Sequence, residues 1–138
     1  MNYKIIGKYI KDLNFSIPNT KTFFLLSKNI ANYKINIDIK SSQIKQNIFE
    51  VYTSLSLKPI KNDFEKINTS IIFSTVIELQ TEIEKDEIEK IILISVPTQI
   101  YSELRNIFIN LFESSGFKDI KINEKVDFEK LYNMKKVQ

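Results

Sequence analysis

The sequence predicts an α+β fold, in which a four-stranded antiparallel sheet carries two or three helices packed on one face. Two observations lead to this prediction. Four stretches in the first part of the chain alternate apolar and polar residues, which is the period of a strand with one dry and one wet face. Beyond residue 85 the period becomes helical, without the strand–helix alternation that builds a parallel sheet.

The first strand is predicted in residues 8–19, with Pro18 and Asn19 at its end because proline cannot donate to a ladder and favours a turn. Ile10 and Lys11 break the alternation, since each falls on the wrong face. The residues expected on the dry face are Tyr9, Leu13, Phe15 and Ile17. Residues 20–31 then hold a short apolar run with no clear period.

Three further strands are expected. The clearest alternation covers residues 33–40, with Tyr33, Ile35, Ile37 and Ile39 apolar, and residues 41–43 are expected to form the turn after it. The third strand covers residues 48–57, and residues 58–68 are predicted to be a loop that contains Pro59. The fourth runs from about residue 70 to residue 83.

The helical part begins with acids in the first turn of residues 86–94, where they suit the positive end of a helix. This helix is expected to stop before Pro97, and Thr98 is expected to cap the next one. Gly116 is predicted to end that second helix as a C-cap. Residues 117–125 form a short strand or loop before a last helix near residues 127–132. The apolar stripe of the long helix is Ile100, Leu104, Ile107, Phe108 and Leu111.

Composition narrows the function classes. At 138 residues, one domain spanning 1–138 is expected. The sequence has no histidine and no cysteine and only two glycines, which argues against a histidine-based enzyme, a zinc site, a phosphate loop, and any metal or cofactor requirement. No apolar run is long enough to cross a bilayer, and the N-terminus lacks a signal-peptide core, so we expect a cytoplasmic protein without membrane insertion.

Charge is unevenly spread along the chain. Residues 1–62 hold ten lysines and three acids, whereas residues 63–90 hold eight acids and three lysines. A nucleic-acid partner is one interpretation of the basic half. The lysines are spaced singly along predicted strands, and the one arginine, Arg105, lies in a predicted helix. Solvated strand faces are the favoured interpretation, so no nucleic-acid partner is expected.

Four motifs occur in a set order along the chain. Residues 9–19 contain Tyr-x-Lys-Asp-Leu-x-Phe-x-x-Pro-Asn. The alternating strand then ends in Asp-Ile-Lys-Ser-Ser at 38–42, Phe-Glu-Val follows at 49–51, and Val-Asp-Phe-Glu-Lys-Leu-Tyr lies at 126–132. In their order and spacing these motifs resemble the SecB family of bacterial protein-export chaperones.

The resemblance implies a homotetramer, a dimer of dimers, that holds unfolded preproteins in the cytoplasm and hands them to the motor SecA. Binding unfolded chains requires exposed apolar surface and free strand edges. The crossover segment 20–31 would lie beside the client groove. The candidate client-binding residues are Phe23, Phe24, Ile30, Tyr33, Ile35, Ile37, Phe128, Leu131 and Tyr132. Ordinary core or subunit contacts remain the alternative for each of them.

The resemblance also implies a SecA contact through acids on the sheet. Asp12 matches one of these acids, and Glu78 is the candidate for another. The sequence departs from the family pattern at Ser16, where a glutamate is usual, and at residues 79–82, where two glycines often follow the strand's glutamate. Its residues 134–138 include two lysines and no acid, whereas the family is usually acidic and often has an acidic C-terminal tail. Client holding therefore carries over more safely than the motor contact.

Three other hypotheses stay open. A SecB-like chaperone for a different client, such as an antitoxin, would never meet SecA. A small α+β protein enclosing an apolar ligand would be a monomer with a closed cavity. An enzyme would need a pair of buried carboxylates, and the acids here fall mostly on wet strand faces or helix starts. Long strands with open edges favour a closed oligomer, but the sequence does not show which strand pairs.

Overall fold

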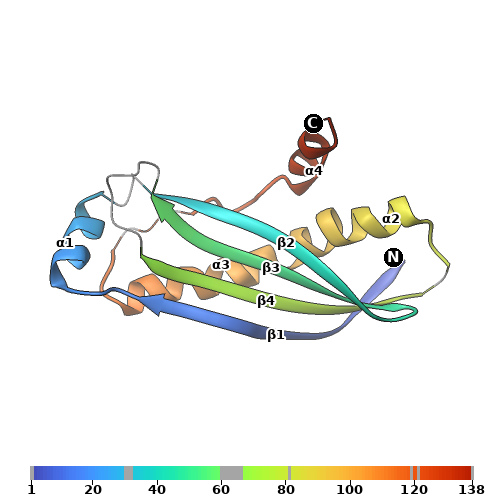
Figure 1. Cartoon of the computed structure of the whole chain (residues 1–138), viewed down its shortest axis with the longest axis horizontal. Helices are drawn as coiled ribbons and strands as arrows, with labels where there is room; N and C mark the ends of the chain where they lie inside the picture. Colours follow the sequence, from blue (N-terminus) through green and yellow to red (C-terminus); the bar gives the residue numbers. More distant parts are fainter. Residues whose placement is uncertain are drawn as a thin grey trace.

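The computed structural model describes residues 2–29, 33–59, 67–80, 82–118, 120 and 122–137. Its sheet consists of β1 (Tyr3–Ser16), β2 (Tyr33–Lys45), β3 (Ile48–Pro59) and β4 (Asn68–Leu79). The strand order is β1-β4-β3-β2 and every neighbouring pair is antiparallel (Figure 1). The predicted four-stranded antiparallel sheet is confirmed, and β1 and β2 are its two edges.

A β-bulge in β1 changes the predicted face of one aromatic residue. The pairing of β1 with β4 shifts register between Ile10 and Asp12. A bulge inserts one residue, so the side chains on either side of it swap faces. Tyr9 therefore lies opposite Ser74 on the outer face, and the expectation that it shares a dry face with Leu13 is wrong. The two out-of-pattern residues at 10–11 are the sequence signature of this bulge.

Two strand ends also differ from the expectation. β2 continues through residues 41–43 to Lys45, and the turn lies at residues 46–47. The alternation there is polar on both faces, but Ser41 and Gln43 still pair with Val51 and Phe49 of β3. β4 stops at Leu79 rather than at residue 83, because its partner strands begin opposite that point.

The helices begin with α1 (Thr20–Asn29), in the segment where the sequence showed no period. Asn19 caps it, since its Oδ1 accepts a hydrogen bond from the Thr22 amide at 2.8 Å. This helix lies at one end of the sheet, on the connection from β1 to β2 (Figure 1).

The expected break before Pro97 does not occur. The chain runs without interruption through α2 (Lys85–Lys90), the π-helical turn η2 (Ile91–Ser95) and α3 (Val96–Ser114). Proline has no N–H to donate and crowds the preceding turn, and a widened π turn just before it lets the helix continue. Thr98 is therefore inside the helix rather than its cap, and its hydroxyl donates to the Ile94 carbonyl at 2.6 Å.

Gly116 ends α3 as predicted. Its φ of 95° is in the left-handed region that favours glycine. The Gly116 amide donates to the Glu113 carbonyl at 3.1 Å and the Phe117 amide to the Phe112 carbonyl at 3.0 Å, which together form a Schellman motif. The reversed chain then leads back along the molecule to α4 (Phe128–Val137) (Figure 1).

The core lies between α3 and the face of the sheet that it crosses. Leu55 on β3, Ile71 on β4, and Leu104 and Phe108 on α3 are all fully buried in one cluster. Helices thus cover one face of the sheet, as the sequence predicted. The opposite face of the sheet, here called the outer face, carries the residues that alternate with this core, and it is open to solvent along much of its area.

Candidate functional site

An apolar hollow lies between edge strand β2, the π turn η2 and the last helix α4. It has a volume of about 120 Å³. Its lining residues are Ile37, Ile39, Leu93, Phe128, Leu131 and Tyr132. These side chains are apolar or aromatic, so the hollow is suited to hold an apolar side chain by burial rather than to perform chemistry.

The strand wall of the hollow follows from the alternation of β2. Ile37 and Ile39 face the helices because they pair with the core-facing residues Leu55 and Thr53 of β3. Both isoleucines are only half-buried. No strand among the described residues pairs with the other side of β2, so the hollow opens beside a free strand edge.

The helix wall is set by the capping of α4. Asp127 Oδ1 accepts a hydrogen bond from the Lys130 amide at 2.9 Å and so starts the helix just before Phe128. Phe128, Leu131 and Tyr132 then fall on one face at i, i+3 and i+4. Phe128 is 2% exposed, whereas Leu131 is 42% exposed. Leu131 is therefore the lining residue most accessible to a ligand.

Leu93 reaches the hollow from the π turn. Pro97 is the physical cause of that turn, as described above, and π turns often occur at functional sites. Leu93 also lines a second hollow of about 510 Å³ between α2 and the β2–β3 hairpin. The other residues of that second hollow are Ser41, Gln43, Gln46, Phe49, Lys85, Ile88, Glu89 and Ile92. The two hollows share Leu93 and both include residues of β2, and we refer to them together as the β2 groove.

The structure brings some of the predicted client-binding residues together and separates others. Ile37, Phe128, Leu131 and Tyr132 line the first hollow, and Ile35 lies one inward position further along β2. Phe23, Phe24 and Tyr33 lie instead toward the α1 end of the molecule (Figure 1). Ile30 lies outside the described residues.

The three aromatic residues near α1 have different surroundings. Phe23 packs on Phe117 with ring centroids 4.9 Å apart, and Tyr33 is 8% exposed. Phe24 is 59% exposed and, with its neighbour Leu25, forms an apolar patch on α1. Of these predicted residues, Phe24 is the one that offers free apolar surface in the single chain.

Two lining residues of the first hollow, Ile39 and Leu93, were not among the predicted client-binding residues. Ile39 continues the alternation of Ile35 and Ile37, and this pattern was sufficient to find it. Leu93 gave no such signal, because its place in the groove depends on how the π turn rotates the helix.

The two acids proposed for SecA lie on the outer face but far apart. Asp12 pairs with Ile72, and Glu78 lies six residues further along β4, which corresponds to about 20 Å of strand. Asp12 accepts a hydrogen bond from Asn14 at 3.2 Å, and Glu78 lies 3.5 Å from the Lys4 ammonium. They do not form one acidic site in the single chain.

Between them lies Glu50, which the sequence reasoning did not single out. Its carboxylate accepts hydrogen bonds from the hydroxyls of Ser74 at 2.6 Å, Tyr52 at 2.8 Å, and Tyr9. The Ser74 hydrogen bond is the main cause that holds the pKa of Glu50 below its ordinary value, and the Tyr9 hydrogen bond adds to it. Lys11 stands 4.1 Å over the ring of Tyr52. The cluster joins β1, β4 and β3 on the outer face.

Among the described residues, no group of three acidic side chains is arranged to hold a metal ion. The helices in that part of the chain are also too short or too polar to cross a membrane.

Comparison with known proteins identifies the family. The family model described as preprotein translocase subunit SecB matches residues 1–138. The chain belongs to the SecB family. A SecB-family protein of Pelagibacter ubique is 39% identical over 135 residues, covering 97% of this chain and 96% of that protein. The protein-export protein SecB of Anaplasma marginale is 24% identical over 140 residues, covering 94% of this chain and 79% of that SecB.

The fold agrees with a solved SecB-like structure. The SecB-like chaperone of Mycobacterium tuberculosis, solved with a peptide from the HigA1 antitoxin, superposes with a TM-score of 0.65 at 10% identity. The match covers 91% of this chain and 88% of that chaperone. At such low identity the likeness establishes the SecB fold alone. The chain is thus a SecB-family protein with the SecB fold.

Proposed function

We propose that this SecB-family protein binds unfolded precursor proteins in the cytoplasm, keeps them competent for translocation and delivers them to SecA. The observation that supports this most directly is the first hollow of the β2 groove, an apolar surface bordered by a free strand edge. A chaperone for many clients needs apolar contact that is tolerant of sequence, and both features supply it. The function is non-covalent holding, so no catalytic residue is assigned.

A bound client segment would lie extended along β2. Backbone groups of the client would pair with the free edge of β2, which gives affinity without reading sequence. Its inward side chains would enter the first hollow, between Ile37 and Leu131. Phe24 on α1 would contact a more distant part of a long client, because it lies toward the other end of the sheet.

We further propose that the protein acts as a homotetramer, a dimer of dimers. β1 is the second edge of the sheet and is fourteen residues long. Three of its apolar side chains are uncovered in the single chain: Ile6 is 48% exposed, Ile10 is 45% exposed and Leu13 is 43% exposed. A strand edge with exposed apolar side chains is stabilised when another subunit covers it. We therefore assign subunit contact to β1 and client contact to β2.

Leu131 provides the sharpest test of the client site. Leu131→Ser should weaken binding of a denatured precursor about tenfold, because roughly half of the about 2–3 kcal/mol for burying a leucine would be lost. Met134→Ser is the matched control, since Met134 is on the same helix and 53% exposed but does not line the hollow. Fluorescence anisotropy with a labelled, urea-denatured precursor measures both. Equal affinity for the wild type and Leu131→Ser would place the client elsewhere.

A second candidate is a SecB-like chaperone whose client is not exported. The SecB-like chaperone of Mycobacterium tuberculosis was solved in complex with an antitoxin peptide, and in the present chain Asp12 and Glu78 are too far apart to form one acidic site within a subunit. Titration with the zinc-bearing C-terminal peptide of SecA separates the two functions. Saturable binding that Asp12→Asn weakens supports delivery to SecA. No binding at low salt, with denatured precursor still held, supports the second candidate.

A further inference from the structure

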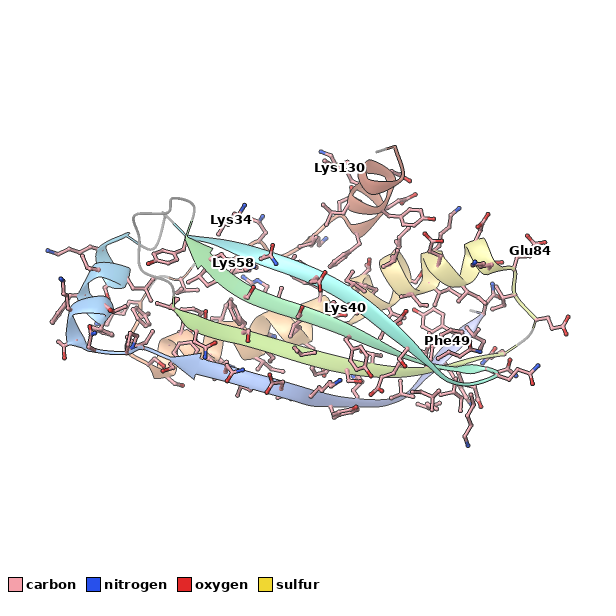
Figure 2. The ribbon with its side chains drawn as sticks, in the orientation of Figure 1. Lys34, Lys40, Phe49, Lys58, Glu84 and Lys130 are labelled. Carbon is pink, nitrogen blue, oxygen red and sulfur yellow. The ribbon has the colours of Figure 1, made fainter. Side chains whose placement is uncertain are left out.

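Strand β2 separates two surfaces of different character. Ile37 and Ile39 face the first hollow of the β2 groove. The residues that alternate with them, Lys34, Asn36, Asp38 and Lys40, face the outer side of the same strand. Figure 2 labels Lys34 and Lys40 along β2, and Lys58 beside Lys34 on β3. An edge strand thus has an apolar side and a polar side on which lysines outnumber acids two to one.

The lysines on the outer side are not neutralised within the described residues. Lys34 pairs directly with Lys58 of β3, and like charges at directly opposed positions destabilise a sheet. The ion pairs found in the described part of the chain join Lys4 to Glu78 and Lys8 to Glu103, so none involves these lysines. Glu50, the acid of β3 on this face, is already bonded to three hydroxyls.

A strand added to the free edge of β2 would continue its alternation. Every second side chain of that strand would point into the groove beside Ile37 and Ile39. The side chains between them would lie on the outer face, beside Lys34, Asn36, Asp38 and Lys40, where two cations face one anion. Cross-strand pairs of opposite charge stabilise a sheet, whereas like charges oppose it.

The second hollow of the β2 groove has no comparable excess of positive charge. The rim of the second hollow carries Lys85 and Glu89, one residue of each sign. The charge preference is therefore expected at the part of β2 next to the first hollow, around residues 34–40.

We propose that this protein selects client segments in which apolar residues alternate with acidic ones. The proposal rests on the proposed client binding at β2 and names the class of client segment that this chain prefers. The apolar side chains are held by the groove, and the acidic ones relieve the repulsion between Lys34 and Lys58 and pair with Lys40. Clients of the same hydrophobicity with basic residues at the alternate positions bind more weakly.

Three short fluorescein-labelled peptides test this directly. In each, leucine and phenylalanine alternate with a variable residue, which is glutamate, glutamine or lysine. The glutamate peptide is expected to bind about tenfold more tightly than the lysine peptide at low salt, with glutamine between them, because each exposed ion pair contributes roughly threefold. The difference should shrink at about 0.5 M salt, where exposed charges are screened beyond a few ångströms.

A matched pair of double variants locates the effect. Lys34→Ser with Lys40→Ser should reduce the glutamate-over-lysine ratio to about threefold or less. Lys118→Ser with Lys125→Ser removes the same charge from the segment between α3 and α4, where both lysines are exposed and line neither hollow, and should leave the ratio unchanged. Circular dichroism and native mass confirm that each variant is folded and assembled.

The outcomes are distinct. Equal binding of the three peptides, a preference for lysine, or a ratio that survives loss of Lys34 and Lys40 overturns this inference while leaving client binding intact. Failure of all three peptides and of denatured precursor to bind the wild type overturns the proposed function itself.

Discussion

Replacing Thr75 with valine should stabilise the protein, because it removes a buried hydroxyl that has no hydrogen-bond partner. Thr75 lies on the core face of the central strand β4, between Phe73 and Ile77 in sequence and opposite Val51 of β3. Its side chain is 0% exposed, and its Oγ1 has no hydrogen-bond partner. Thr53 on the neighbouring strand is also 0% exposed and has an unpaired hydroxyl.

The magnitude follows from the cost of that hydroxyl. In the unfolded chain it is hydrated, whereas in the folded core it is dehydrated without a new partner, which costs about 1–3 kcal/mol in proteins. Valine keeps the branched shape, so the packing and the strand preference are retained. We expect Thr75→Val to raise the free energy of unfolding by about 1–2 kcal/mol.

Urea denaturation followed by circular dichroism measures this effect. Protein concentration must be held constant, because the stability of an oligomer depends on it. The midpoint should rise with an unchanged slope. Thr75→Ser is the control, since it keeps the hydroxyl and removes a buried methyl group, and it should lower the midpoint. A Thr75→Val protein less stable than the wild type would refute the reasoning, since it would show that the hydroxyl is bonded in the folded state.

Two further predictions concern the end of α3 and the outer face. Gly116→Ala should lower the free energy of unfolding by about 1–2 kcal/mol, because φ at Gly116 is 95° and the added Cβ would lie 3.4 Å from the Phe23 ring. Thermal melting measures this effect, and an unchanged melting temperature would contradict it. Glu50→Gln should remove an acid-sensitive part of stability. The pKa of Glu50 is lowered in the folded protein, mainly by the Ser74 hydrogen bond, so its contribution is present above the ordinary carboxyl pKa of 4.5 and is lost as the pH falls through the lower folded value. The wild-type advantage over Glu50→Gln should therefore be full near neutral pH and narrow below about 4.5, and a gap that widens in acid would count against this assignment.

Much of the fold was predictable because it depends on local patterns. The alternation in β2 predicted that Ile35 and Ile37 lie on one face of a strand. The sequence at the end of α3 predicted Gly116 as the C-cap, since a left-handed C-cap has a strong glycine preference. The errors came where tertiary contacts override local rules. Pro97 was expected to stop a helix, but the packing of α3 against the sheet keeps the helix continuous and a π turn absorbs the strain.

The candidate site was predictable only in part. The sequence placed Phe128, Leu131 and Tyr132 on the last helix, and the structure confirms that helix and puts all three on the wall of the first hollow. The sequence did not identify Leu93 or the cluster around Glu50, whose members are joined by strand order rather than by sequence distance.

The sequence by itself determined the resemblance to the family, the four strands followed by helices, and the alternation that gives β2 one apolar and one polar side. Only the tertiary structure decided that β2 is an edge and that Leu93 and α4 complete a groove beside it. It also decided that a bulge turns Tyr9 toward Glu50. The physical reason is that alternation fixes which side chains share a face, whereas the order of strands fixes which faces and edges remain open to another chain.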